Sequence, residues 1–123
     1  MPASLEKRSH PRVKDRLTLR SSSPHDGSHE MATLNLSLSG AHVTAGRFIP
    51  LMTRFEVTLM LPPEDGLEAR PYPVSMEAVV VRVHPQEAVT GRDRYEIGLF
   101  FSRMEQRDRN ALARYLSSRS RQA

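Results

Sequence analysis

The sequence predicts a mostly β fold, an antiparallel barrel of about six strands that is capped by one amphipathic helix. Apolar and polar residues alternate in several short segments, and turn-forming residues separate these segments. Near the C-terminus the apolar spacing changes to that of a helix. A closed barrel also leaves no free sheet edge, which suits so small a sheet. The length of 123 residues fits one compact domain.

The N-terminal half contains two clear strand signals. Leu17 and Leu19 alternate with polar residues and predict a short first strand, whereas the polar segment 21–30 is predicted to be a loop. The segment 33–39 is predicted to be the next strand, with leucines on the inward face and polar residues outward. The inward set is Leu34, Leu36 and Leu38, and the outward set is Asn35, Ser37 and Ser39.

The C-terminal half is predicted to add further strands and the helix. Strands are expected at 41–44, 54–61, 79–83 and 95–101, with a turn at 62–66. Ser102 and Glu105 have the spacing of a capping box, which predicts a helix start. The helix is expected to end near Ser117, with residues 119–123 as a disordered tail.

Charge and composition limit the classes of binding partner and the cellular location, but they do not identify one partner. Lys and Arg total 18 against 14 Asp and Glu, a net charge of +4 that favours an anionic partner. The absence of cysteine excludes disulfides and thiolate metal sites. No stretch is apolar enough to span a bilayer, and the first residues lack the apolar segment of a secretion signal. We therefore expect a cytoplasmic protein.

A basic arm is predicted to precede the barrel. Residues 1–16 are polar, and Pro2 and Pro11 oppose helix formation, so the segment is expected to be extended and flexible. Arg8 and Arg12 on such an arm are suited to binding an anionic ligand. One guanidinium group donates two parallel hydrogen bonds to phosphate oxygens, and it also stacks on planar bases. Taken alone, the segment is better explained as a solvated basic tail.

A second group of candidate residues lies at the end of the strand predicted at 33–39. An outward amide on Asn35 and an outward hydroxyl on Ser37 offer hydrogen bonds to a ligand. Gly40 permits a positive φ and a close approach of a ligand to the backbone. Polar residues are also ordinary on the wet face of a strand, so this group alone does not establish a site.

Together the two groups resemble the signatures of the PilZ family, R-x-x-x-R followed by [D/N]-x-S-x-x-G. The matching segments are Arg8-Ser9-His10-Pro11-Arg12 and Asn35-Leu36-Ser37-Leu38-Ser39-Gly40. The resemblance implies a six-stranded PilZ-type barrel over residues 17–118 that binds the bacterial second messenger cyclic di-GMP. It also implies that residues 1–16 close over the ligand, and that a protein partner in motility, exopolysaccharide or transcription machinery reads the result.

The resemblance also suggests a role for each motif residue. Arg8 and Arg12 would contact phosphate and guanine, Asn35 a guanine edge, and Ser37 a phosphate or guanine. Gly40 would form the tight turn. A second, stacked ligand molecule would contact Lys7. Where Asn35 stands, the motif often has Asp, which accepts two guanine N–H bonds, so lower affinity is expected here.

Two other readings stay open, and an enzyme is not expected. The arm and the helix arginines would suit a nucleic-acid-binding protein, although aromatic residues for stacking are few. A PilZ-like protein-interaction module without ligand is the second alternative. His25, Asp26 and His29 only loosely suggest metal ligands, because nothing in a polar loop holds them rigidly. Neither a metal nor a cofactor is therefore expected.

Overall fold

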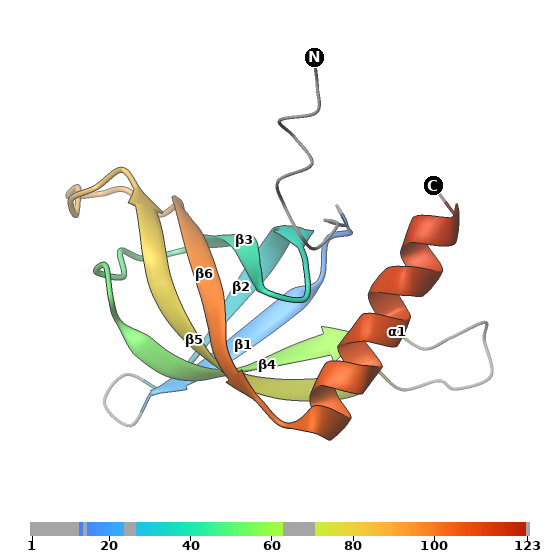
Figure 1. Ribbon diagram of the computed structural model, residues 1–123. Helices are drawn as coiled ribbons and strands as arrows, with labels where there is room; N and C mark the ends of the chain where they lie inside the picture. Colours follow the sequence, from blue (N-terminus) through green and yellow to red (C-terminus); the bar gives the residue numbers. More distant parts are fainter. Residues whose placement is uncertain (1–12, 14, 24–26, 63–70, 123) are drawn as a thin grey trace, which may run out of the picture.

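The structure, a computed structural model, describes residues 13, 15–23, 27–62 and 71–122. Six antiparallel strands close into a barrel, and one helix follows them (Figure 1). The elements are β1 (Thr18–Ser23), β2 (Gly27–Leu36), β3 (Gly40–Ala45), β4 (Arg54–Leu61), β5 (Tyr72–His84), β6 (Tyr95–Met104) and α1 (Gln106–Gln122). The order around the barrel is β1-β2-β3-β6-β5-β4, so β6 lies between β3 and β5. The predicted barrel with a C-terminal helix is confirmed.

The core fills the inside of the barrel with the alternating apolar residues of the strands. Burying one Val, Leu or Ile completely contributes about 1.5–3 kcal/mol. The strand residues with the largest fully buried apolar side chains are Leu19, Leu36, Val43, Val57, Leu59, Val74, Val80 and Ile97. Helix α1 packs against β5 and adds Leu112, Tyr115 and Leu116 to the same cluster. The helix is thereby fixed to the barrel by its apolar stripe.

The first hairpin differs from the sequence prediction. The segment 21–30 is not a loop, because β1 continues to Ser23 and β2 begins at Gly27. The register pairs Thr18 with Ala32 and Ser23 with Gly27, and β1 also pairs with β4 on its other side. A strand with partners on both sides has its backbone groups satisfied whatever its side chains are. Tertiary pairing therefore overrides the polar composition of this segment.

Strand β2 contains an irregularity that changes which residues face inward. The register with β3 shifts between Thr33 and Asn35, which leaves Leu34 as the extra residue of a β-bulge. Thr33 and Leu36 are buried, while Leu34 and Leu38 are only half-buried. Of the predicted inward set, Leu36 is buried in the core and Leu38 packs against the core while half-buried, whereas the prediction is wrong for Leu34. The strand also ends at Leu36 rather than at residue 39.

Helix α1 begins and ends later than predicted. The backbone N–H of Arg109 donates to the carbonyl of Glu105, so Glu105 is the residue that caps the helix. Ser102 lies within β6, and its hydroxyl donates to Glu77 at 2.7 Å, so the predicted capping box is wrong. The helix continues to Gln122, so the expected end near Ser117 and a tail starting at residue 119 are also wrong. No helix in the described part of the chain has the length and apolarity needed to cross a membrane.

Candidate ligand-binding site

The end of the predicted arm is joined to the strand that carries the second motif. The N–H of Val13 donates to the carbonyl of Leu36 at 2.7 Å, and the N–H of Leu36 donates to the carbonyl of Val13 at 2.8 Å. Val13 is also buried, so the packed part of the chain begins before residue 17. Leu36 stands between Asn35 and Ser37 in the sequence. Val13 is therefore held beside the second motif.

The predicted arm residues Lys7, Arg8 and Arg12 lie outside the described residues. Arg12 directly precedes Val13, however, and consecutive Cα atoms are about 3.8 Å apart.

Asn35 lies on the outward face of the barrel, as predicted. It stands opposite His42 on β3, and residues directly opposite each other in an antiparallel pair share a face. His42 is in turn opposite Gly98 on β6, which is opposite Arg82 on β5. One outward row therefore runs across four strands, from the amide of Asn35 through His42 and Gly98 to the exposed guanidinium of Arg82.

Ser37 does not project outward. It is 1% exposed, and its hydroxyl accepts from the N–H of Ser39 at 3.2 Å and lies 3.3 Å from the carbonyl of Gly40. The N–H of Ser37 donates to the same carbonyl at 2.8 Å. The prediction failed because the strand ends at Leu36 and the chain turns, so strict alternation no longer applies. Ser37 holds the turn between β2 and β3 in shape.

Gly40 is required for a reason other than the one predicted. Its φ is not positive; instead, a Cβ at this position would lie 2.2 Å from the carbonyl oxygen of Leu99 on β6. The N–H of Phe101 donates to the carbonyl of Ser39 at 2.9 Å, which pulls β6 against the turn. Gly40 therefore permits β3 and β6 to approach closely where the turn ends.

Three residues beside the motif were not singled out as site residues from the sequence. Phe100 is opposite Gly40, and the residue is 49% exposed. His42 lies 3.3 Å from the carboxylate of Glu96, a partner that sequence reasoning did not find. Arg82 belongs to the row described above. The alternation in β6 already puts Gly98 and Phe100 on its outward face, but only the barrel register brings them beside Asn35.

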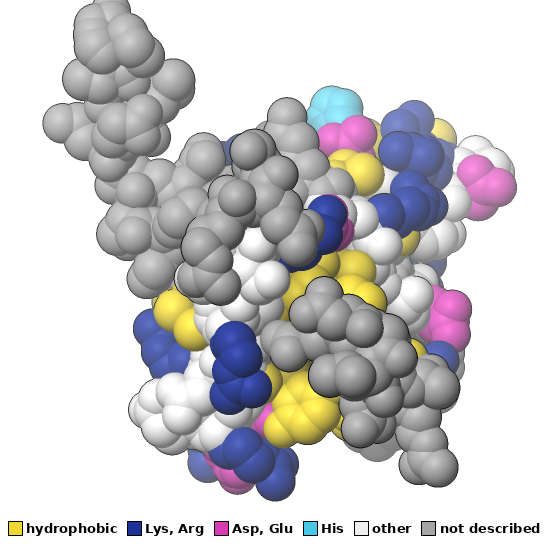
Figure 2. All heavy atoms as spheres, turned by 90° about the vertical axis from the view of Figure 1, so that its right-hand side faces the viewer, with side chains coloured by type: hydrophobic (Ala, Val, Ile, Leu, Met, Phe, Trp, Pro, Cys, Tyr) yellow, Lys and Arg dark blue, Asp and Glu magenta, His cyan; other side chains and the backbone are white. Residues whose placement is uncertain are grey.

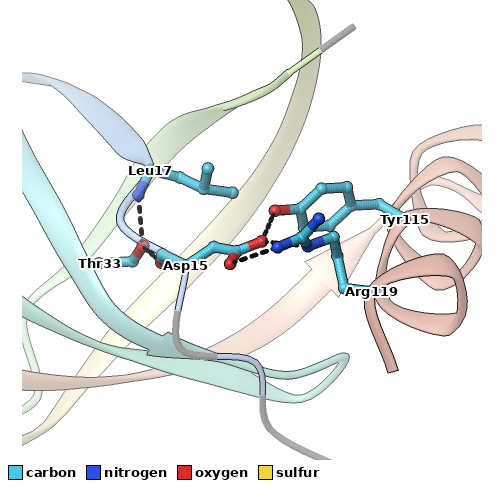
Figure 3. Close-up of polar contacts among 5 residues, drawn as sticks. All are labelled: Asp15, Leu17, Thr33, Tyr115 and Arg119. Carbon is cyan, nitrogen blue, oxygen red and sulfur yellow. Dashed lines mark hydrogen bonds and ion pairs between the residues drawn. The ribbon is translucent and has the colours of Figure 1, made fainter. Parts of the chain in front are cut away.

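Asp15 connects the start of the barrel with helix α1 (Figure 3). Its carboxylate accepts a hydrogen bond from the hydroxyl of Tyr115 and forms an ion pair with Arg119 at 2.7 Å. Its backbone carbonyl accepts from the hydroxyl of Thr33 at 2.8 Å, and that hydroxyl also accepts from the N–H of Leu17. Burial, and then the hydrogen bond with Asp15, raise the pKa of Tyr115, so the phenol keeps its proton and donates.

Metal chemistry has no supporting geometry in the described part of the chain. Residues 15–23, 27–62 and 71–122 contain no group of three or more His, Cys, Asp or Glu side chains that would hold a metal ion. His25 and Asp26 lie outside the described residues, as does the side chain of His29.

Basic and acidic side chains are mixed on the face that carries α1. Figure 2 shows Lys and Arg side chains there in several separate groups, with acidic side chains among them and an apolar area between. A nucleic-acid-binding surface is expected to have basic side chains clustered on one face or along a helix. On the visible part of this face the basic side chains are interspersed with acidic ones, whereas the sequence of α1 contains five arginines and one acidic residue.

Comparisons with known proteins agree with this architecture. The PilZ domain model matches residues 6–118. The structure of Bacillus subtilis Inhibitor of motility (MotI/DgrA) is 20% identical with a TM-score of 0.75, covering 94% of this chain and 52% of that one. The PilZ domain of YcgR from Escherichia coli, solved with c-di-GMP, is 13% identical with a TM-score of 0.65, covering 95% and 94%.

A third structure is that of MrkH, described as a c-di-GMP-dependent transcription regulatory factor. It is 17% identical with a TM-score of 0.71, covering 94% of this chain and 52% of that one. The present chain thus spans about half the length of the MotI and MrkH chains. At these identities the likeness shows a common fold. No curated protein matches the sequence. Because the family model covers most of the chain, the protein belongs to the PilZ domain family.

Proposed function

We propose that this protein is a cyclic di-GMP receptor whose arm orders on ligand binding and whose bound form is read by a protein partner. The observation that carries the proposal is the pair of hydrogen bonds between Val13 and Leu36. They hold Val13, the residue that follows the R-x-x-x-R segment in the sequence, beside Leu36, which lies between Asn35 and Ser37 of the second motif. Support also comes from the family and from the YcgR PilZ domain, which was solved with this ligand.

The proposed site has a cationic side and a hydrogen-bonding side. Arg8 and Arg12 bind the phosphates from the arm, and Lys7 extends the cationic side towards a second ligand molecule. Asn35 binds a guanine edge. Ser37 and Gly40 act mainly by shaping the turn, since the hydroxyl of Ser37 is already engaged within it. The role is binding and not catalysis.

Titration with cyclic di-GMP tests the proposal directly. We expect saturable binding by isothermal titration calorimetry, and no comparable binding of GTP. At a free ligand concentration of 100 times the dissociation constant, the free energy of unfolding should rise by about 2.7 kcal/mol. An absence of binding heat together with an unchanged melting temperature would show that the chain is a protein-interaction module without this ligand.

Asn35→Asp should raise the affinity for cyclic di-GMP by about fivefold. A carboxylate accepts two guanine N–H bonds, and charge-assisted hydrogen bonds contribute about 1.5–3 kcal/mol against about 1 kcal/mol for neutral ones. The measurement is the dissociation constant by calorimetry. Asn110→Asp, on the exposed face of α1, adds the same charge away from the site and should leave the affinity unchanged. A weaker Asn35→Asp variant beside an unchanged Asn110→Asp would remove Asn35 from the guanine edge.

A further inference from the structure

The outward row that begins at Asn35 contains one position without a side chain. Gly98 on β6 stands opposite His42 of β3 on one side and opposite Arg82 of β5 on the other. A Cβ added at Gly98 would lie only 3.1 Å from the Cβ of Arg82, so the arginine side chain starts directly beside this position. Gly98 thus forms a floor of bare backbone between His42 and Arg82, on three strands that the structure describes throughout.

A β-bulge determines that Arg82 faces outward. The register between β5 and β6 pairs Val80 with Leu99 and Arg82 with Gly98, which leaves Val81 as an extra residue. Without this extra residue, Val81 would stand opposite Gly98 and Arg82 would point into the core, because side chains alternate along a strand. Bulges are often found next to active sites, where they re-aim a side chain. The bulge therefore places a cationic side chain where regular alternation would place a valine.

Two further outward residues of β6 bound the same floor along the strand. Phe100 and Glu96 lie two positions to either side of Gly98, and Phe100 is an exposed aromatic residue. The carboxylate of Glu96 lies 3.3 Å from Nε2 of His42, and its side chain is still 45% exposed. Between the flanking Cα atoms the floor measures about 14 Å along the strand and about 10 Å across it, from the ordinary spacings of a sheet. A flat ring system of the size of a purine fits these dimensions.

The side chains around the floor match guanine better than adenine. One edge of guanine presents two acceptors, O6 and N7, to which an arginine donates a pair of hydrogen bonds. The adjacent edge presents N–H donors, which a carboxylate accepts. Arg82 lies across the strands from Gly98 and Glu96 lies along the strand, so the two side chains face adjacent edges of a base placed over Gly98. Adenine has an amino donor in place of O6 and loses both arrangements.

We infer that the floor at Gly98 is a guanine-selective subsite for the second base of the ligand, and that Arg82 and Glu96 select the base. The inference rests on the proposed function, in which Asn35 binds the first guanine edge. Gly98 is two strands away from Asn35, which is about 10 Å at the ordinary strand spacing. One cyclic dinucleotide therefore reaches both places with its two bases. Every residue of the subsite belongs to a strand of the barrel.

Competition binding with cyclic di-GMP and cyclic di-AMP on the full chain tests the subsite. Both ligands have the same ring and the same charge, so general electrostatic attraction affects them equally. Arg82→Ala should weaken cyclic di-GMP binding by about tenfold, within the range for one arginine–guanine pair, and cyclic di-AMP binding by less than about twofold. The preference for cyclic di-GMP, which is the ratio of the two dissociation constants, should fall accordingly. Glu96→Gln should lower this preference by about fivefold, since it replaces a charged acceptor with a neutral one.

Arg54→Ala is the matched control for Arg82→Ala. Arg54 is an exposed arginine on the next strand, β4, and its removal changes the charge equally, so the wild-type preference should be retained. Glu96→Gln carries the test if Arg82→Ala does not fold, as judged by thermal melting. A wild-type preference in Arg82→Ala and Glu96→Gln, including equal weakening of both ligands, would overturn the subsite alone. No binding of cyclic di-GMP to the wild type would overturn both the subsite and the proposed function.

Discussion

Arg12→Ala should lower the affinity for cyclic di-GMP by about 100-fold or more while leaving the barrel folded. Two charge-assisted bonds to phosphate contribute about 1.5–3 kcal/mol each, and the lower end of their sum already corresponds to about two orders of magnitude. Arg12 precedes the first described residue of the barrel, and its neighbour Val13 is attached to β2 through backbone groups that the substitution does not touch. Calorimetric titration at fixed salt measures the affinity, and thermal melting monitors the fold.

Arg16→Ala is the matched control for Arg12→Ala. Arg16 is an exposed arginine four residues further along the chain, and removing it changes the net charge by the same amount. If general electrostatic attraction accounts for binding, the two variants should lose affinity equally. A specific contact predicts a large loss for Arg12→Ala and less than about threefold for Arg16→Ala, since exposed charges are largely screened. Wild-type affinity in Arg12→Ala would place the site elsewhere.

The parts of the fold that were predictable are those in which a strand follows strict alternation. Val57 and Leu59 in β4, and Ile97 and Leu99 in β6, are buried as their spacing indicates. The first hairpin was not predictable in this way, because its polar segment is held by backbone pairing with two neighbouring strands. Pairing partners far along the chain leave no local pattern. The end of α1 was missed similarly, because Arg119 bonds to Asp15, a partner remote in sequence.

The candidate site shows the same division between local and long-range information. The outward position of Asn35 follows from local alternation, but the buried hydroxyl of Ser37 depends on the bulge at Leu34 and on the turn after Leu36. The row from Asn35 to Arg82 depends on the barrel order, in which β6 is inserted between β3 and β5. A hairpin-by-hairpin reading of the sequence pairs neighbouring strands and therefore misses that insertion.

Gly40→Ala should destabilise the protein by about 3 kcal/mol or more, which is the upper part of the range for overpacked sites. The added methyl would lie 2.2 Å from the carbonyl oxygen of Leu99, which belongs to the backbone of a strand paired on both sides. A flexible side chain is able to move away, but this carbonyl moves only with β6. The clash with the new methyl group is therefore relieved only if β3 and β6 separate, at the place where the carbonyl of Ser39 accepts the N–H of Phe101.

Gly46→Ala provides the control for Gly40→Ala. The nearest atom to its new methyl group is the carbonyl oxygen of Asp93 at 3.8 Å, an ordinary contact, and the residue is exposed. Thermal unfolding should show a melting temperature lower by more than about 10 °C for Gly40→Ala and nearly unchanged for Gly46→Ala. Equal melting temperatures would show that the strands yield easily at Gly40. If the melting temperature of Gly40→Ala falls as expected, a loss of ligand binding in this variant is explained by the disturbed pairing of β3 and β6. The motif glycine then belongs to the scaffold that holds Asn35 in place.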